Sequence, residues 1–125
     1  MIEQAGSICW VDQHIVLVSN KGKTRWVIPK GHLESSDTEL ADRARCEAWE
    51  EAGVKTDSVA RAVGEFLYQK RGGLYRVSVF IFENCTLSDS WPEASMRTRQ
   101  LVDPAKAASM VHERGLKEIL LSLKQ

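Results

Sequence analysis

The sequence predicts an α/β fold made by one domain, and three observations support this prediction. The chain has 125 residues, which is the length of one ordinary domain with one hydrophobic core. Runs with the β-branched and aromatic content of strands alternate with runs at helical spacing. Glycine and proline are sparse and stand at plausible turns, so no linker divides residues 1–125.

The N-terminal part is expected to be mainly strand. Residues 5–11 and 14–19 are two short apolar runs joined by Asp12-Gln13, which predicts a hairpin. A polar turn then leads into a third strand at 24–28. Pro29 ends this strand because it has no backbone donor, and a loop is expected to follow.

From Ser36 onward the pattern becomes helical. Ser36 and Glu39 have the spacing of a capping box, and helix-forming residues follow them. Gly53 is well placed as the C-terminal cap. A helix is therefore expected between the capping box and Gly53.

The rest of the chain is expected to add a strand pair and two helices. Residues 59–70 and 74–83 have the composition of an antiparallel pair around a glycine turn. Pro104 can start a short helix at 104–110, and residues 113–123 carry leucine and isoleucine at helical spacing.

Composition and charge exclude several classes of protein. Lys plus Arg and Asp plus Glu both number 17, so no global positive field favours generic nucleic-acid binding or an anionic membrane. No stretch approaches the roughly 20 apolar residues of a membrane span, and the N-terminus does not resemble a signal peptide. Cys9, Cys46 and Cys85 are odd in number and far apart, unlike a disulfide framework or a zinc site. A cytoplasmic protein that binds anions only locally is expected.

The candidate chemistry lies in three glutamates of the predicted helix. Glu47, Glu50 and Glu51 stand at i, i+3 and i+4, within an arc of about 100°. Like charges this close repel one another, so a compensating cation is expected. Hard oxygen ligands indicate Mg²⁺ or Mn²⁺. A glutamate-rich helix can also be only a solvated face. Here, however, the helix follows a strand, the turn Pro29-Lys30-Gly31 and a polar loop, where backbone groups commonly face ligands.

These residues resemble the box of the Nudix hydrolases, which is a glycine, a loop, then a helix bearing Arg-Glu, a Glu-Glu pair and a glycine. The resemblance includes residues 25–29 before the box and the segments Trp91-Pro92-Glu93 and Arg97-Thr98-Arg99 after it. It is greatest to the diphosphoinositol polyphosphate phosphohydrolase and diadenosine polyphosphate hydrolase branch.

The resemblance implies an α/β/α sandwich with a mixed sheet. It also implies hydrolysis of a pyrophosphate bond in a small molecule, namely a nucleoside-diphosphate-linked, dinucleoside polyphosphate or diphosphoinositol polyphosphate substrate. Glu47, Glu50 and Glu51 would be the metal ligands, with the carbonyl of Lys30 or Gly31 completing the shell.

Two departures from the family pattern concern the arginine of the box. The span from Gly31 to Gly53 is one residue longer than usual, and Cys46 occupies the arginine position. In the family this arginine is expected to pair with a helix glutamate, which cysteine cannot do. Arg45 could replace it if a π-bulge absorbed the extra residue, and Arg43 is the other candidate.

The extra residue can instead lie in the loop at 35–37. In that case either Asp37 or Glu39 would be the counterpart of the glutamate in the middle of the family's box. The sequence leaves both placements open.

A general base and phosphate-binding groups complete the predicted site. Glu50 or Glu51 could take a proton from the attacking water, but a metal ligand is a poorer base. Glu34 is the candidate outside the helix, with a solvated loop charge as the alternative. Basic side chains that could bind phosphate are Arg25, Lys30, Arg76, Arg97 and Arg99. Arg97 and Arg99 would face the same side if they lie on a strand.

Two other functions remain open. One is a housecleaning nucleoside triphosphate pyrophosphohydrolase, which would need a base-recognition pocket that the sequence does not indicate. The other is a non-catalytic module that binds phosphate ligands, which Cys46 and the lengthened box suggest.

Overall fold

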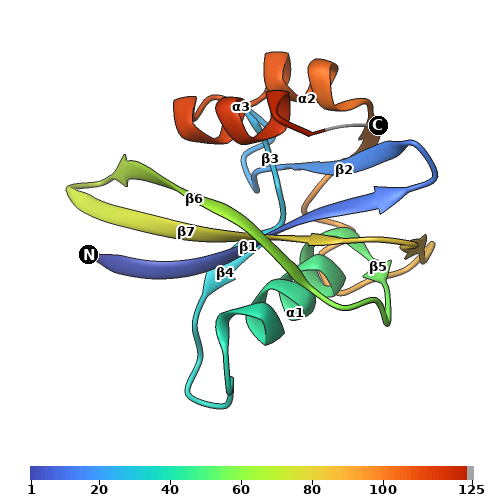
Figure 1. Cartoon of the computed structure of the whole chain (residues 1–125), viewed down its shortest axis with the longest axis horizontal. Coiled ribbons are helices and arrows are strands. Elements are labelled where there is room, and N and C mark those ends of the chain that lie inside the picture. The colour runs from blue at the N-terminus through green and yellow to red at the C-terminus, as the bar shows by residue number, and fades with distance from the viewer. Residues whose placement is uncertain (124–125) are drawn as a thin grey trace.

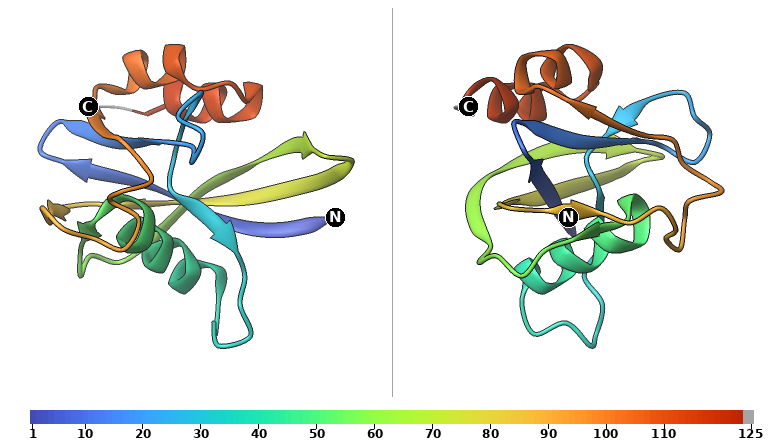
Figure 2. Two further views of the ribbon diagram at one scale, coloured as in Figure 1. Left: turned by 180° about the vertical axis from the view of Figure 1, so that it is seen from behind. Right: turned by 90° about the vertical axis from the view of Figure 1, so that its right-hand side faces the viewer.

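The computed structural model describes residues 1–123 and shows a mixed sheet with helices on both faces (Figures 1 and 2). Helix α1 (Leu40–Ala52) covers one face, and α2 (Pro104–Met110) and α3 (Arg114–Leu121) lie together on the other. This is the predicted α/β/α arrangement. The strands are β1 (Ile2–Val11), β2 (His14–Ser19), β3 (Trp26–Val27), β4 (Lys30–His32), β5 (Val54–Lys55), β6 (Arg61–Lys70), β7 (Gly73–Phe82), β8 (Thr86–Leu87) and β9 (Arg99–Val102).

Strand β1 organises the sheet, whose order is β3-β2-β1-β7-β6, with β4 paired to β1 and β9 paired to β2. On one side β1 runs parallel to β7 from Ile2↔Tyr75 to Cys9↔Phe82. On its other side it pairs antiparallel with β4 at one end and with β2 at the other. The strands β2 and β4 therefore separate along the same edge of β1.

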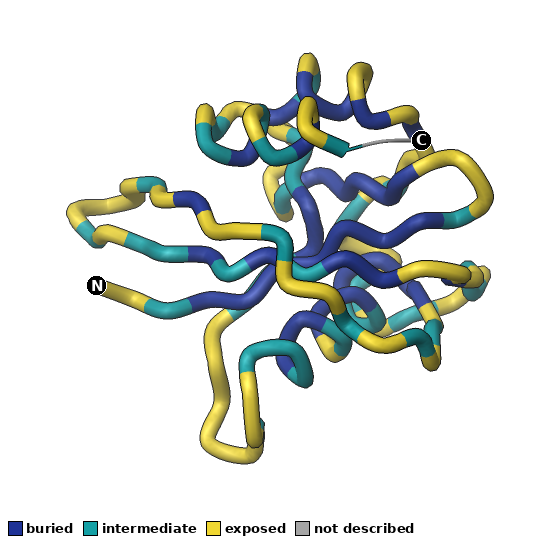
Figure 3. Tube along the Cα trace, viewed as in Figure 1, coloured by how far each residue is buried: buried dark blue, intermediate teal, exposed yellow. Residues whose placement is uncertain are grey.

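Two apolar clusters fill the space between the sheet and its helices. Neighbouring residues of β1 point to opposite faces, so Ile8 joins the cluster under α2 and α3, whereas Cys9 joins the cluster under α1. Helix α1 packs through Ala44, Ala48 and Ala52, which are all buried. These small side chains, spaced by four residues, let α1 lie close to the sheet. Figure 3 shows the buried parts of the chain in dark blue.

The start of α1 differs from the prediction, because Ser36 and Glu39 form no capping box. The helix begins at Leu40, and Glu39 occupies the N-cap position without a side-chain cap bond. Asp37 instead closes a local turn with Glu34, whose backbone N donates to Asp37 Oδ2 at 2.8 Å. Asp and Asn side chains compete in this way with helical hydrogen bonding. The other end is as predicted, since Gly53 caps α1 with a left-handed φ of 66°.

The strand after the hairpin is shorter than predicted, since 24–28 contributes only Trp26–Val27. The predicted loop after Pro29 contains a strand, β4, which pairs with residues 4–6 of β1. Helix α2 starts as expected, with the Asp103 side chain accepting from Lys106 N at 2.8 Å. No helix among residues 1–123 is long and apolar enough to cross a membrane.

Candidate active site

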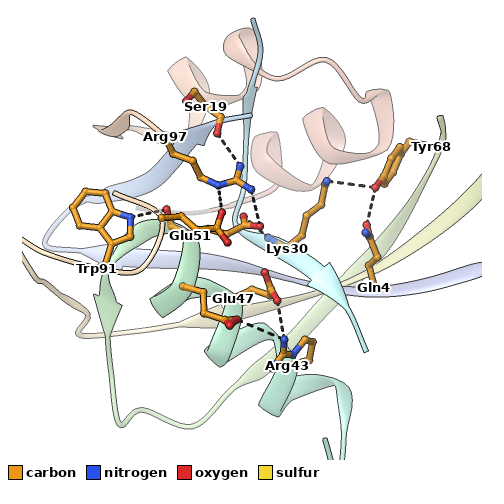
Figure 4. A network of polar contacts seen from close by, with 11 residues as sticks. Gln4, Ser19, Lys30, Arg43, Glu47, Glu51, Tyr68, Trp91 and Arg97 are labelled. Atoms are coloured by element: carbon orange, nitrogen blue, oxygen red, sulfur yellow. Dashed lines mark hydrogen bonds and ion pairs between the residues drawn. The ribbon is translucent and has the colours of Figure 1, made fainter. Parts of the chain in front are cut away.

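Two of the predicted acidic residues, Glu47 and Glu51, line a cleft of about 690 Å³ between α1, β4, the β6–β7 hairpin and the segment that precedes β9, whereas Glu34 and Glu50 do not line it. Figure 4 shows the polar contacts in this region. The cleft lies where β2 and β4 separate along β1. A different cavity of about 440 Å³, between Trp10 and Leu123, contains none of the predicted site residues.

Two of the three predicted carboxylates are buried at the floor of the cleft. Glu47 is 8% exposed and Glu51 is 6% exposed, whereas the side chain of Glu50 is 41% exposed. The Glu51 Oε1 atom accepts from the backbone N of Lys30 at 3.1 Å, and its Oε2 atom accepts from Arg97 at 3.1 Å. The helix and β4 are therefore joined through a carboxylate of the predicted metal site.

Burial makes negative charge costly in this cleft. Desolvation raises the pKa of Glu51 to about 8, although the nearby Arg97 guanidinium opposes the shift. Desolvation also raises the pKa of Glu47, and the charge of Glu50 adds to the effect. A hydrogen bond with Glu51 and the positive charge of Arg43 lower the pKa of Glu47, but they do not cancel this rise. Closely spaced buried carboxylates of this kind are typical of sites that bind a cation.

Arg43 pairs with the glutamates of α1, which Cys46 cannot do. Its Nη1 atom lies 2.9 Å from Glu34 Oε2, 2.9 Å from Glu47 Oε2 and 3.6 Å from Glu50 Oε2. Its Nε atom lies 3.1 Å from Asp37 Oδ2, as an ion pair without hydrogen-bond alignment. The Arg43 side chain is only 6% exposed. One guanidinium thus holds two carboxylates of α1 and two of the preceding loop.

The alternative substitute, Arg45, points elsewhere. Its two terminal nitrogens donate to the carbonyls of Thr56 and Ser58, both at 2.8 Å, and its guanidinium lies 4.8 Å from the Phe82 ring centroid. Helix α1 is regular over its whole length, so no π-bulge turns Arg45 toward the cleft. The loop before α1 accommodates the extra residue, and Asp37 rather than Glu39 pairs with the arginine.

The segment after Trp91 fixes the C-terminal end of α1. The indole N–H of Trp91 donates to Glu51 O at 3.0 Å. Arg97 donates to Ser19 O at 2.9 Å and to Glu93 at 2.7 Å, in addition to its contact with Glu51. These bonds place the Arg97 guanidinium at the edge of the cleft.

The predicted phosphate-binding residues separate into two groups. Lys30 and Arg97 line the cleft, and Arg25 lines a neighbouring pocket. Arg99 instead donates to the carbonyls of Ala52 and Ser88 at 2.9 and 2.8 Å. Arg76 pairs with Glu3, to which its Nε atom donates at 3.2 Å, and does not line the cleft.

Tyr68 and Tyr75 were not among the predicted site residues, yet both line the cleft. Their rings are stacked with centroids 4.8 Å apart. The Tyr68 hydroxyl donates to Gln4 at 2.7 Å and accepts from Lys30 Nζ at 3.4 Å. The glycine turn carried a signal for this pair, because a tight hairpin there places these two tyrosines opposite each other.

The donor set suits a hard divalent cation. It consists of carboxylate oxygens, and the backbone of Gly31 lies directly against Glu47, where a Cβ atom would overlap the carboxylate. No group of three metal-ligating side chains among residues 1–123 is already arranged around a common point. The carboxylates instead hold Arg43 and Arg97, so a bound cation would compete with these arginines.

Comparison with known proteins agrees with this geometry. A family model described as the NUDIX domain matches residues 2–120. The mutator MutT protein of Bacillus halodurans has a similar structure, with a TM-score of 0.75 and 16% identity over 97% of this chain and 80% of that chain. An Ap4A hydrolase of C. elegans gives 0.73 and 15% over 97% and 93%. A NUDIX hydrolase from Nitrosomonas europaea gives 0.77 and 13% over 96% and 86%.

The three structural relatives share the fold at low identity, and the family match covers nearly the whole chain. The helix that bears the glutamates, Gly31 beside it and the cleft that they line all lie within that match. The chain therefore belongs to the NUDIX domain family and is an enzyme that acts on pyrophosphate bonds.

Proposed function

We propose that this enzyme uses Mg²⁺ or Mn²⁺ to hydrolyse a phosphoanhydride bond in a dinucleoside polyphosphate, a nucleoside-diphosphate-linked compound or a diphosphoinositol polyphosphate. The observation that carries the proposal is the pair of buried carboxylates, Glu47 and Glu51, in a cleft that is otherwise rich in basic side chains. The basic residues that line it are Lys21, Lys30, Lys70, Arg71 and Arg97. Polyanions and divalent cations bind together at such sites.

The proposed metal ligands are Glu47, Glu50 and Glu51, together with the carbonyl of Gly31 or Lys30. A bound cation would neutralise anhydride oxygens and lower the pKa of an attacking water. Glu50 is exposed enough to turn toward an incoming ion. Lys30 and Arg97 are placed to hold the phosphates, because both reach the cleft from the side opposite α1.

We propose Glu34 as the group that accepts the proton of the attacking water. Arg43 holds Glu34 beside Glu47, through the same nitrogen that contacts Glu47. The Glu34 side chain is 59% exposed, so water reaches it. Glu50 and Glu51 stay the alternative bases, but metal coordination would weaken their basicity.

The substrate class is proposed from the family resemblance and from the relatives. One of the similar structures is named an Ap4A hydrolase, and another a mutator MutT protein. Hydrolysis of simple nucleoside triphosphates is therefore the second candidate function. The structure adds one observation in its favour, which is a second pocket beside the acidic cleft. We also propose a cytoplasmic location, since all three cysteines are free.

A metal-dependent hydrolysis screen tests the proposal. The panel contains nucleoside triphosphates, dinucleoside polyphosphates, nucleotide sugars and inositol pyrophosphates, each with Mg²⁺, Mn²⁺ or chelator. Turnover is expected only with metal, and dinucleoside or inositol pyrophosphates are expected to give higher kcat/KM than triphosphates. Release of nucleoside monophosphate chiefly from simple triphosphates would favour the second candidate. Binding of these ligands without turnover at saturating metal would contradict both.

Replacing Gly31 by alanine is expected to weaken metal binding. The new Cβ atom would overlap the Glu47 carboxylate, which must then move. Loss of the support for a metal ligand typically lowers metal affinity by about 10–100-fold. The backbone of Gly31 is not left-handed, so the alanine itself causes no strain. Isothermal titration with Mn²⁺ measures the effect.

Gly22→Ala is the matched control for this substitution. A Cβ atom at Gly22 would meet only Thr24 Oγ1, at 4.0 Å. Its Mn²⁺ affinity is expected to equal that of the wild type. Equal affinity of the Gly31→Ala variant would show that the position of Glu47 does not govern metal binding.

A further inference from the structure

Lys30 contacts a carboxylate of the cleft through its backbone and a tyrosine through its side chain. Its backbone N donates to Glu51 Oε1 at 3.1 Å, whereas its Nζ atom lies 3.4 Å from the Tyr68 hydroxyl oxygen. Figure 4 shows the side chain extended from Glu51 toward Tyr68. The two ends of this residue therefore have different surroundings within one cleft.

The partner of the Lys30 ammonium is neutral. The ion pairs formed among residues 1–123 all belong to arginines, namely Arg43, Arg61, Arg76 and Arg97. An ammonium group has three donors, and in the described part of the chain only the Tyr68 hydroxyl accepts from that of Lys30. The positive charge and two donors are thus left for an anion in the cleft.

The Tyr68 side chain is fixed at both its hydroxyl and its ring. The hydroxyl donates to Gln4 Oε1 at 2.7 Å, and Gln4 is only 6% exposed on β1. The ring stacks on that of Tyr75, with centroids 4.8 Å apart. The Tyr68 centroid also lies 4.9 Å from Lys30 Nζ, within the range of a cation–π contact. The ammonium therefore rests against a rigid support.

A lysine side chain needs such support to act at a defined point. Its four-carbon stem is flexible, so keeping the ammonium in one place costs rotamer entropy. A partner that already holds the ammonium beside the cleft reduces the entropy that remains to be lost when an anion binds. The benefit should then appear as tighter binding of the anion.

We propose that Tyr68 is a positioning residue that holds the Lys30 ammonium where it binds a phosphate group of the substrate. This inference rests on the proposed function, because it assumes that the cleft binds a pyrophosphate. Tyr68 acts through Lys30 in this assignment and is not a catalytic residue. The contact between Lys30 and the phosphate forms before the anhydride breaks, so its loss is expected to raise KM more than it lowers kcat.

Binding of imidodiphosphate tests the proposal without turnover, since a nitrogen replaces the bridging oxygen of this pyrophosphate analogue. Isothermal titration in saturating Mg²⁺ measures its Kd. Tyr68→Phe removes the hydroxyl and keeps the ring, so it is expected to weaken binding about threefold to tenfold, as for the loss of one hydrogen bond. Lys30→Met removes the charge and keeps the length of the side chain, and about tenfold or greater weakening is expected. Unchanged Kd in either variant, or no binding by the wild type, would overturn the proposal.

The double variant Tyr68→Phe/Lys30→Met separates positioning from a structural role. If Tyr68 acts through Lys30, removal of its hydroxyl is expected to change Kd less than twofold once Lys30 has been replaced. Equal weakening by Tyr68→Phe with and without Lys30→Met would contradict the assignment. Such additivity would show that the hydroxyl contacts the ligand directly or supports the fold in general.

Tyr75→Phe is the matched control, because it removes a hydroxyl from the ring stacked on Tyr68. The hydroxyl that contacts Lys30 and Gln4 is that of Tyr68. Any effect of Tyr75→Phe on Kd is therefore expected to be equal with and without Lys30→Met. A dependence on Lys30 as great as that of Tyr68→Phe would remove the special role of the Tyr68 hydroxyl.

The positioning role and the proposed reaction can fail separately. A wild type that is inactive in the whole hydrolysis screen, with a Tyr68→Phe effect that still depends on Lys30, would refute the reaction and leave the positioning role intact. Metal-dependent turnover, with additive effects of the two substitutions on imidodiphosphate binding, would refute the positioning role and leave the reaction intact.

Discussion

Replacing Glu51 by glutamine is expected to lower kcat by about 10²–10³-fold, the loss that is typical when one group that stabilises charge in the transition state is removed. The variant removes a charge at the centre of the proposed metal site. It keeps the shape of the side chain and an oxygen that can accept from Lys30 N. The loss is expected in kcat more than in KM, because the charge would be needed most when the anhydride breaks.

The stability of this variant is not expected to fall with its activity. Burial raises the pKa of Glu51 to about 8, so the fold disfavours the charged form. Removing the charge is therefore expected to leave the free energy of unfolding unchanged or higher. A residue whose removal costs activity but not stability serves function.

Steady-state kinetics on the substrate that the screen identifies, together with urea unfolding, measures both effects. Glu65→Gln is the control, because Glu65 is exposed and lies outside the cleft. Its kcat is expected to match that of the wild type. Unchanged turnover in the Glu51 variant would refute the proposed mechanism.

The sequence predicted those features of the site that depend on local spacing. The shared face of Glu47 and Glu51 follows from helical geometry alone, and so does the cap at Gly53. The alternation of helices and strands also gave the fold class correctly. In these cases the interactions that determine the structure lie within a few residues of each other.

Other features depend on contacts between distant segments, which spacing does not show. Strand β4 exists because its three residues find an edge on β1, although Pro29 directly before it suggested a loop. Arg99 was predicted to bind phosphate, and its Nη1 atom donates to the carbonyls of Ala52 and Ser88, two contacts that its spacing from Arg97 does not reveal. The choice between Arg43 and Arg45 depended on where the extra residue lies, and the regular α1 places it in the preceding loop and not in a π-bulge.

The predicted capping box failed for a related reason. Ser36 and Glu39 have the required spacing, but the side chain of Asp37, which lies between them, accepts from the backbone N of Glu34. The same aspartate contacts Arg43. The loop conformation therefore places Asp37 against Arg43 and leaves the N-terminus of α1 without a side-chain cap.

Replacing Arg43 by glutamine is expected to lower the free energy of unfolding by about 3–5 kcal/mol in metal-free buffer, as is typical when one partner of a buried ion pair is removed. The side chain is 6% exposed, and its removal leaves the buried Glu47 and Asp37 carboxylates without a counter-charge. Urea unfolding in the presence of chelator measures the loss.

Divalent cations are expected to restore part of this stability. A bound Mg²⁺ or Mn²⁺ would neutralise the same carboxylates that Arg43 holds, and its stabilisation grows with the ratio of concentration to Kd. The variant is expected to gain more stability from Mn²⁺ than the wild type does. An equal gain in both proteins would show that Arg43 and the cation do not share ligands.

Introducing arginine at position 46 tests whether Arg43 already takes the role of the arginine of the box. Cys46 is exposed, and Arg43 already contacts Glu47 and Glu50. The Cys46→Arg variant alone is therefore expected to change kcat less than twofold, about the scatter of a surface substitution. In the Arg43→Gln background, the same substitution is expected to restore activity and stability in part, since an arginine at 46 lies four residues before Glu50 and can pair with it. A large gain from Cys46→Arg in the wild-type chain would instead mean that Arg43 does not replace the arginine of the box.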